Sequence, residues 1–483
     1  MDACRLPHGD VGRNGRDADC GDSAPVGRPE SRDMNCVPVA VGVPTVAFHT
    51  FGCRLNQSES DLLGRGFTAA GYTVVDPASP SDLCVINTCS VTECAEAECR
   101  RLIRKILKKK PDTFLAVTGC YAQVGVDALR KIKGIDLIAG ADHKLLMPSL
   151  IQNGLSKLSE PLIFHSPKIS KDNFTLTDIG TPTAVAVFNH QTRPNVKIQD
   201  GCDFFCSFCI IPYTRGRERS RKFNDVLLEA SLWAAQGYKE IVLTGVNLGE
   251  YIDGNRGLPD LINALETIDG LARIRISSIE PTTVSPLLLD NMGKMTCSQK
   301  LCPHLHLPLQ SGSNKILSDM GRRYTREDYI AFVHEAMNKV PDLSLGTDVM
   351  VGFPGESEKD FAETVSLIED LPFSYLHVFP FSERKGTRVI KMKLTNVPLS
   401  TIKKRSQILH ALSNKKKDTF YNAAIGKSVD VLFENSSEKD FYTGYTGNFI
   451  RVGVRSARCL SGQLLRVVIT DVADGIAAGQ LSY

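Results

Sequence analysis

Apolar runs of strand length, each stopped by a turn, recur near the beginning of the chain. Three of them cover residues 45–50, 83–87 and 114–118. Their length and β-branched content predict buried strands, and the pattern of residues 99–108 predicts a helix between two of them. Strands that alternate with helices favour a parallel sheet. We therefore expect an open parallel α/β sheet domain at this end of the chain.

A second alternation of strands and helices fills the middle of the chain. Six strand patterns are each succeeded by a helical pattern, and they cover residues 195–199, 240–245, 273–277, 303–307, 343–349 and 374–379. A closed barrel of this type has eight β/α units. Six units predict a partial (β/α)6 barrel, with its site at the carboxyl ends of the strands.

The last sixty or so residues change character. Short runs at 429–433, 441–445, 450–454 and 464–469 are separated by turns rich in Gly, Asn and Ser. Closely spaced short strands with such turns predict a small β-barrel.

These patterns divide the 483 residues into five segments. Residues 1–43 are rich in Gly, Asp, Arg and Pro without periodicity, so we expect a disordered extension. The other segments are the α/β domain over 44–155, a linker over 156–190, the partial barrel over 191–419 and the small barrel over 420–483. A chain of this length seldom folds around one core, which agrees with several domains.

Composition limits the class of protein. Hydrophobic residues at 42% and charged residues at 23% are ordinary for a globular protein. No run approaches the length of a membrane span, and the first residues lack the apolar core of a signal peptide, so we expect no membrane partner. Fifteen cysteines without a framework of short disulfide loops favour the reducing cytoplasm.

Three cysteines within eight residues are the most informative motif. Cys202, Cys206 and Cys209 follow the strand pattern that ends near residue 199. Three thiolates can hold a four-iron cluster and leave one iron without a protein ligand. The alternative is a zinc site, which requires a fourth ligand, and no second close pair of Cys or His follows Cys209.

A second set of cysteines is spread over the first domain. Cys53, Cys89 and Cys120 each stand directly after one of the three strand patterns. The carboxyl ends of parallel strands share one edge of a sheet, so these thiols are expected to converge. They could hold a second iron–sulfur cluster, although any one of them alone would be read as a buried free cysteine.

Basic residues near the cysteine loop suggest a contact with nucleic acid. The net charge of +3 does not by itself indicate such a partner. Arg215, Arg217 and Arg219, however, follow Cys209 closely and could contact phosphates beside the reaction site. The other basic clusters, at 100–110, 322–326, 403–405 and 415–417, are each better explained as solvated helix faces.

The two cysteine triads together resemble the radical S-adenosylmethionine methylthiotransferases. The resemblance rests on residues 50–57 (Thr-Phe-Gly-Cys-Arg-Leu-Asn-Gln), on 87–92 and 118–123, and on the loop over 199–210. It covers nearly the whole chain after residue 44. Within the family, Cys-Arg-Leu-Asn is most similar to the branch acting on threonylcarbamoyladenosine at tRNA position 37. The isopentenyl-adenosine branch usually has Cys-Gln-Met-Asn, and the ribosomal-protein branch has Cys-Pro-Lys-Asn.

The resemblance implies two 4Fe–4S clusters and S-adenosylmethionine as cofactors. It further implies a set of residues near S-adenosylmethionine at the rim of the partial barrel: Gly245, Asn247, Glu280, His306, Asp348 and Val351. A surface salt bridge or a core histidine is an equally good reading of Glu280 or His306.

The carboxy-terminal segment resembles the TRAM domain, a small RNA-binding barrel. Tyr442 and Tyr445 are candidates for stacking on bases. Aromatic residues of small barrels more often belong to the core, which is the alternative for both.

The expected activity is the conversion of a C–H bond of tRNA adenosine 37 into C–S–CH3. The C2–H bond of a purine is not acidic, so the cofactors must supply the reactivity. The resemblance implies the tRNA anticodon stem-loop, a sulfur source and an electron donor such as flavodoxin or ferredoxin as partners. The alternatives are methylthiolation of isopentenyl-adenosine or of a ribosomal protein, and a non-catalytic RNA-binding protein stabilised by metal.

Overall fold

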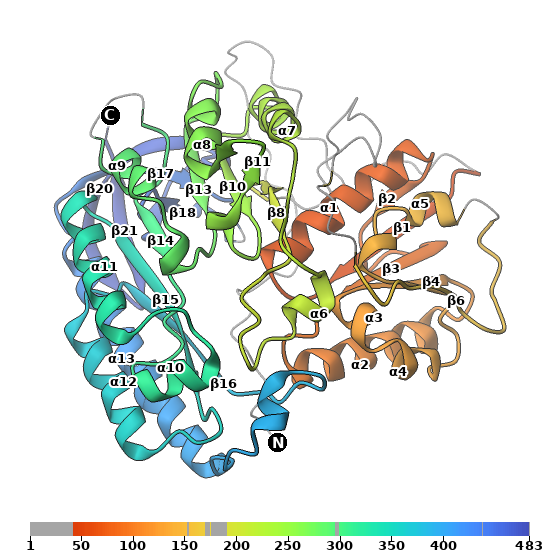
Figure 1. Cartoon of the computed structure of the whole chain (residues 1–483). Coiled ribbons are helices and arrows are strands. Elements are labelled where there is room, and N and C mark those ends of the chain that lie inside the picture. Colours follow the sequence, from red (N-terminus) through yellow and green to blue (C-terminus); the bar gives the residue numbers. More distant parts are fainter. Residues whose placement is uncertain are drawn as a thin grey trace.

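The structure is a computed structural model that describes residues 42–151, 154–169, 174, 191–294, 299–436 and 438–482. Nearly all of the predicted disordered extension and much of the predicted linker lie outside these residues. Two α/β bodies lie side by side, and a small β-barrel lies against the larger one, behind it in Figure 1. No described helix has the length and apolarity needed to cross a membrane.

The amino-terminal body is a six-stranded sheet in which every neighbouring pair of strands is parallel. This arrangement confirms the predicted open sheet and extends it. Across the sheet the strands are β2 (Thr73–Val75), β1 (Thr45–Thr50), β3 (Leu83–Thr88), β4 (Phe114–Gly119), β5 (Leu137–Ala139) and β6 (Leu162–Phe164). The last of these, β6, lies within the range predicted as a linker.

Helices cover both faces of this sheet because its strands are apolar on both sides. In β3, Leu83 and Val85 pack into the core under one layer of helices, and Cys84 and Ile86 pack into the core under the other. The helices are α1 (Arg54–Ala69), α2 (Glu93–Lys109), α3 (Cys120–Val124), α4 (Val126–Arg130) and α5 (Met147–Leu150).

The central body is the predicted open barrel of six parallel strands. Two three-stranded sheets, β13-β10-β7 and β14-β15-β16, are joined by isolated parallel bridges that pair Ile274 with Leu301 and Ser278 with His306. The strands are β7 (Asn195–Lys197), β10 (Glu240–Thr244), β13 (Arg273–Ile276), β14 (His304–His306), β15 (Ser344–Val351) and β16 (Tyr375–Pro380).

Helices surround the outer face of the partial barrel. They are α7 (Phe223–Ala235), α8 (Leu258–Glu266), α9 (Pro286–Gly293), α10 (Asn314–Met320), α11 (Arg326–Lys339), α12 (Glu358–Asp370) and α13 (Leu399–Asn422). Apolar side chains such as Ile241, Leu243 and Ile274 belong to the core beneath them. Because strand side chains alternate, the inner face carries polar residues instead, among them Glu240 and Arg275.

The carboxy-terminal body is a closed five-stranded barrel. Its order is β17-β18-β19-β21-β20. The strands are β17 (Ser428–Phe433), β18 (Phe441–Thr446), β19 (Arg451–Arg455), β20 (Leu464–Ala473) and β21 (Ile476–Leu481). The sequence pattern predicted four of these strands but not β21, whose Ala and Gly residues lack β propensity. Pairing of β21 with both β19 and β20 completes the barrel.

Helix α1 joins the amino-terminal body to the partial barrel. It lies along the boundary between them in Figure 1, and Arg65 in its last turns forms a buried ion pair with Glu229 of α7. The short helix α6 (Ile211–Arg215) follows the cysteine loop and packs against α3 at the same boundary. The boundary therefore brings the loop of the second body close to the strand ends of the first.

Candidate functional site

The loop that carries Cys202, Cys206 and Cys209 depends on Gly201. This glycine has φ +70°, and a Cβ at its position would lie 1.9 Å from the backbone oxygen of Arg217. Only glycine fits so close to a backbone oxygen in this left-handed conformation. The loop crosses between β8 (Gln199–Asp200) and α6, and β8 pairs with β9 (Arg219–Ser220).

The three thiols lie near one another in a largely apolar environment. Burial, with a smaller contribution from the neighbouring thiol of Cys206, raises the pKa of Cys202 and that of Cys209 to about 12. The backbone N–H of Phe204 donates to Sγ of Cys202 at 3.4 Å, and a guanidinium nitrogen of Arg322 lies 3.5 Å from Sγ of Cys206. Donors directed at sulfur favour thiolate ligands, so the loop fits an iron–sulfur cluster.

The spacing of the sulfurs does not fit a single zinc ion. Four ligands at a Zn–S distance of about 2.3 Å stand about 3.8 Å apart. Among the described residues, only one group of three His, Cys, Asp or Glu has all its ligand atoms within 4.8 Å of one another, and that group contains no cysteine. Both cysteine triads are thus more widely spaced, as a larger cluster requires.

The structure also brings Cys53, Cys89 and Cys120 together. Cys53 precedes α1, Cys89 follows β3 and Cys120 begins α3. Burial raises the pKa of Cys89 to about 12, with further contributions from Cys120 and Cys53. A Cβ at Gly52, which has φ +93°, would lie 2.9 Å from Sγ of Cys89. Cys53 is exposed while Cys89 and Cys120 are buried, so the group opens to one side.

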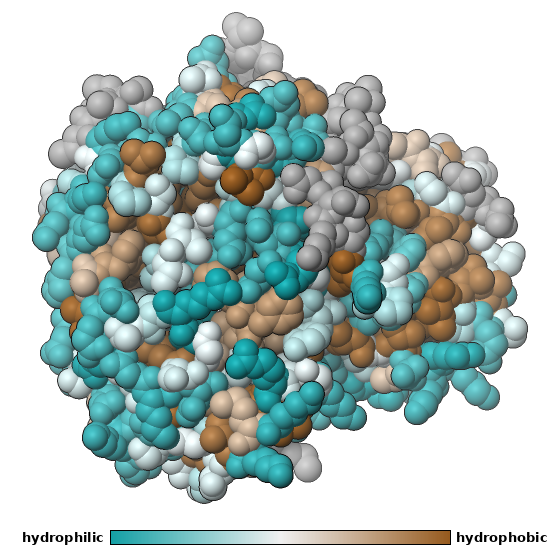
Figure 2. Space-filling model, in the orientation of Figure 1, coloured by the Kyte–Doolittle hydropathy of each residue, from teal (hydrophilic) through white to brown (hydrophobic). Residues whose placement is uncertain are grey.

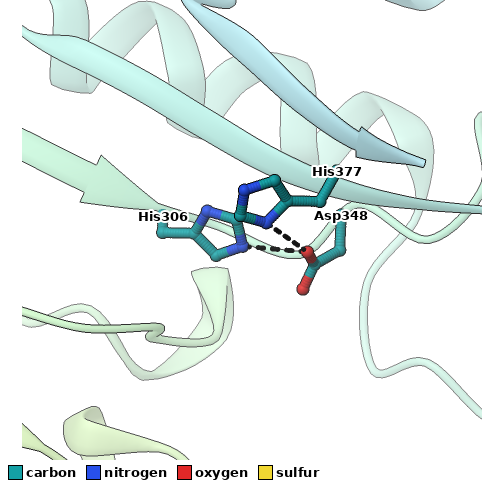
Figure 3. A group of neighbouring side chains, drawn as sticks. All are labelled: His306, Asp348 and His377. Carbon is teal, nitrogen blue, oxygen red and sulfur yellow. Dashed lines mark ion pairs between the residues drawn. The ribbon is translucent and has the colours of Figure 1, made fainter. Parts of the chain in front are cut away.

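Two predicted residues, His306 and Asp348, meet a third, His377, on the inner face of the partial barrel. Figure 3 shows the rings of His306 and His377 directed at one carboxylate oxygen of Asp348, at 3.0 and 3.4 Å. Burial alone would raise the pKa of Asp348, but the two imidazoles hold it well below its usual value. His377 was not predicted from the sequence, because a histidine in a strand carries no sign of its partners.

Glu280 reaches the cysteine loop through an arginine. It forms an ion pair with Arg322, the residue that also contacts Cys206. Burial raises the pKa of Glu280, and Arg322 opposes that rise. Asn247 accepts hydrogen bonds from the backbone N–H of Glu280 at 3.1 Å and from Thr283 at 2.9 Å. Asn247 thus orients the Glu280 turn from within the protein.

Two of the predicted cofactor residues, Gly245 and Val351, do not direct a side chain towards the inner face of the partial barrel. Gly245 lies against Gln199, and an added Cβ would come within 2.8 Å of the Gln199 amide oxygen. Val351 is fully buried in the main core. Strand alternation places its neighbour Met350 on the inner face, so the side chain of Val351 is directed away from that face.

The three arginines predicted to contact phosphates do not share one environment. Arg215 is only 3% exposed and binds Glu59 at 2.9 Å and Asp200 at 3.0 Å, so its charge is neutralised inside the protein. Arg219 is largely buried and pairs with Asp200 at 3.4 Å. Arg217 alone is exposed, and it pairs with Asp203 of the cysteine loop. Arg215 is therefore a structural residue, in contrast to the expectation.

Glu59 of α1 was missed by sequence reasoning. It binds Lys144 at 2.5 Å, Lys197 at 2.8 Å and Arg215, and all of these side chains are buried. In the sequence, Glu59 is only a polar residue within a helical pattern, and its partners come from three distant segments.

The two tyrosines of the small barrel also differ. Tyr442 packs against the barrel core, as the alternative for aromatic residues proposed. Tyr445 stacks on Phe449 with ring centres 4.8 Å apart, and the guanidinium of Arg193 lies 4.5 Å above its ring. Tyr445 thus lies at the contact between the small barrel and the partial barrel.

Family comparisons agree with this arrangement of two cysteine triads. A family described as "Uncharacterized protein family UPF0004" matches residues 45–140, and the "Radical SAM superfamily" matches residues 196–368. The first contains Cys53, Cys89 and Cys120, and the second contains the cysteine loop.

Similar chains are known from several bacteria. Threonylcarbamoyladenosine tRNA methylthiotransferase MtaB of Bacillus subtilis (strain 168) is 34% identical over 443 residues, which cover 90% of this chain and 96% of the relative. MtaB of Aquifex aeolicus (strain VF5) is 37% identical, covering 88% and 100%. A tRNA-2-methylthio-N(6)-dimethylallyladenosine synthase of Geobacillus thermodenitrificans (strain NG80-2) is 35% identical, covering 90% and 82%.

A solved structure shares the fold. The radical S-adenosylmethionine methyltransferase TsrM from Kitasatospora setae, solved with cobalamin and a 4Fe–4S cluster bound, matches with a TM-score of 0.50. The match covers 70% of this chain and 75% of TsrM at 15% identity, so it bears on the fold alone.

Proposed function

We propose that this chain, which belongs to the radical S-adenosylmethionine tRNA methylthiotransferases, adds a methylthio group to C2 of N6-threonylcarbamoyladenosine at position 37 of tRNA. The observation that carries the proposal is the meeting of two cysteine triads at one domain boundary. Helix α6 directly follows the cysteine loop, and it packs against α3, which begins at Cys120. A base held at this boundary can face both triads.

The loop of Cys202, Cys206 and Cys209 would hold the cluster used with S-adenosylmethionine. With that cofactor, the cluster supplies a carbon radical able to attack a C–H bond that acid and base groups cannot ionise. Arg322 would neutralise negative charge at the loop, since it reaches both Cys206 and Glu280. Glu280 and Asp348 would offer carboxylate oxygens to the amino and hydroxyl groups of S-adenosylmethionine, beside the partners that orient them.

The triad of Cys53, Cys89 and Cys120 would hold the second cluster and supply sulfur. Its exposed member, Cys53, lies at the start of α1, on the boundary with the partial barrel. The reaction also requires an electron donor such as flavodoxin or ferredoxin, and a source that replaces the transferred sulfur.

The choice of substrate rests on relatives of two branches. Three relatives at 34–37% identity carry the threonylcarbamoyladenosine name, while others at 33–35% carry the dimethylallyladenosine name. The first group supports the proposal, and the second defines the alternative.

Mass spectrometry of tRNA nucleosides from a strain lacking this gene tests the choice. We expect the 2-methylthio form of threonylcarbamoyladenosine to disappear and the unmethylthiolated form to accumulate. Loss of 2-methylthio-isopentenyl-adenosine instead would overturn the substrate assignment. Anaerobic purification tests the cofactors separately, because two clusters require about eight irons and eight sulfides per chain.

A further inference from the structure

The side chain of Arg54 extends from the amino-terminal body towards the small barrel. It is the first residue of α1 and directly follows Cys53. Its guanidinium lies 5.9 Å from the ring centre of Phe449, which belongs to the small barrel. Among the described residues, no carboxylate forms an ion pair with Arg54, although the side chain is half-buried. A guanidinium in such a position is costly unless a polar or anionic group joins it.

Further arginines surround the same aromatic ring. The guanidinium of Arg275 lies 4.9 Å from the centre of Phe449, and that of Arg193 lies 5.9 Å from it. Three guanidinium groups thus lie within 5.9 Å of the centre of one ring, where like charges repel one another.

The local carboxylates are already used by these neighbours. Glu240 binds Arg275 at 2.7 Å and lies 3.7 Å from Arg273, and Glu434 binds Arg193 at 2.5 Å. Four arginines, with Arg54 included, thus share two glutamates, which leaves an excess of two positive charges. The excess would attract an anion that the protein itself does not provide.

Arg54 also borders the polar inner face of the partial barrel. The ring centre of Tyr375 lies 6.4 Å from that of Phe449, the ring beside Arg54. The Tyr375 hydroxyl lies 3.2 Å from Nδ1 of His306, whose other nitrogen binds Asp348. A series of neighbouring side chains therefore leads from the group in Figure 3 through Tyr375 and Phe449 to Arg54. Because Arg54 directly follows Cys53, a base held beside that triad would carry its substituent close to Arg54.

We propose that Arg54 binds the carboxylate on the N6 substituent of the target adenosine, in a subsite that Phe449 and Tyr375 complete. The inference rests on the proposed function, in which that substituent is threonylcarbamoyl. A guanidinium and a carboxylate form two parallel hydrogen bonds, which fix orientation as well as position. An apolar N6 substituent would leave Arg54 without its anion, so the same subsite selects against it.

The test uses three anticodon stem-loops that differ only at position 37. One carries threonylcarbamoyladenosine, one its neutral methyl ester and one dimethylallyladenosine. Binding affinity and methylthiolation rate are measured for the wild type, Arg54→Gln, Arg54→Lys and the control Arg130→Gln, which alters an exposed residue of α4. Iron content and Tm are measured for every protein.

We expect the wild type and Arg130→Gln to bind the threonylcarbamoyl stem-loop about 10- to 100-fold more tightly than its ester, as a charge-assisted hydrogen bond predicts. Arg54→Gln should bind the two equally, with its affinity for the ester unchanged. Arg54→Lys should retain part of the preference, because an ammonium keeps the charge but not the two parallel bonds.

Other outcomes would overturn the inference. A preference that survives in Arg54→Gln would mean that the carboxylate is bound elsewhere. An equal loss of affinity for all three stem-loops would mean that Arg54 contacts the RNA backbone. Failure of the proposed function would give a different result. The wild-type protein would carry both clusters but would not methylthiolate the threonylcarbamoyladenosine stem-loop. The binding comparison needs no turnover, so it remains readable in a variant that loses iron.

Discussion

A glycine with positive φ directly precedes three of the six predicted cysteine ligands. These are Gly52, Gly119 and Gly201, and in each case an added Cβ would lie within 3 Å of another atom. At Gly119 that atom is the backbone oxygen of Thr88, at 2.4 Å. A side chain at these positions would force apart the segments that bring the thiols together.

Replacement of Gly201 by alanine should remove the first cluster. The new Cβ would collide with the backbone oxygen of Arg217, and backbone cannot move aside as a flexible side chain can. We expect iron to fall from about eight to about four atoms per chain, with loss of 5′-deoxyadenosine formation.

Gly254→Ala is the matched control for that variant. Gly254 has a similar φ of +66° and no atom within 4 Å of an added Cβ. It imposes the left-handed strain of about 1–2 kcal/mol without the collision. Full iron content in Gly201→Ala, or equal iron loss in both variants, would refute this account of the loop.

Loss of one cysteine from each triad should stop a different step of the reaction. Cys206→Ala removes one of three ligands from the loop and should abolish cleavage of S-adenosylmethionine. Cys89→Ala should leave that cleavage intact and stop sulfur insertion, because Cys89 lies in the other body. 5′-Deoxyadenosine and the methylthiolated nucleoside are measured from the same anaerobic reaction. Normal methylthiolation by Cys89→Ala would exclude the second triad from the chemistry.

At the scale of elements, α1 is attached to the partial barrel by buried charges. Burial alone would raise the pKa of Glu59, but Arg215, Lys144 and Lys197 hold it well below its usual value. These partners come from α6, from the segment before α5 and from β7. One carboxylate thus determines how the helix that begins beside Cys53 lies against the barrel.

Glu59→Gln should destabilise the attachment of α1 by about 3–5 kcal/mol, because three buried cations lose their shared anion. The folded-state pKa of Glu59 is depressed, so its contribution is present above the unfolded pKa near 4.5 and is lost as pH falls below that value. Thermal unfolding from pH 7 to pH 3 measures both effects. The variant should lose less stability than the wild type below pH 4.5.

The control is Glu335→Gln, which removes an exposed i,i+4 pair with Lys339. Such surface pairs contribute about 0.3–0.5 kcal/mol, so its Tm should stay near that of the wild type. A Glu59→Gln protein as stable as this control would show that the network does not hold the two bodies together.

For the whole molecule, three exposed arginines surround the cysteine loop. Arg217 pairs with Asp203, Arg323 donates to the Asp203 carbonyl at 2.7 Å, and Arg388 lies 3.4 Å from the Phe205 carbonyl. They come from separate parts of the chain and face solvent. On the face shown in Figure 2, strongly hydrophilic residues lie beside hydrophobic ones in the region between the two bodies. The three arginines form a basic rim around the cysteine loop, and this rim is suited to hold an RNA backbone near the site.

Removal of the three rim charges should weaken tRNA binding in a salt-dependent way. Each lost phosphate contact should lower the slope of log affinity against log salt by about 0.7–0.9. We expect Arg217→Gln, Arg323→Gln and Arg388→Gln together to lower it by about two or more, with both clusters intact. Lys339→Gln at the carboxyl end of α11, which lies at the opposite end of the partial barrel from the loop, should leave the slope unchanged. An unaltered slope in the triple variant would place RNA recognition elsewhere.

The sequence by itself determined the fold class and the family of this protein. Apolar runs of period two or 3.6 are local properties of the chain, so they indicate strands and helices without knowledge of the partners. The spacing of Cys202, Cys206 and Cys209 is equally local. The position of Cys53, Cys89 and Cys120 after successive strands also predicted their convergence, because parallel strands end at one edge.

Only the tertiary structure decided what the charged residues contact. Arg215 and Arg217 look alike in the sequence, yet one is buried against Glu59 and the other faces solvent. Arg322 belongs to a basic cluster that reads as a solvated helix face, but it reaches Glu280 and Cys206. The partner of a charge comes from distant segments and its strength depends on burial, and neither property is written in the local pattern.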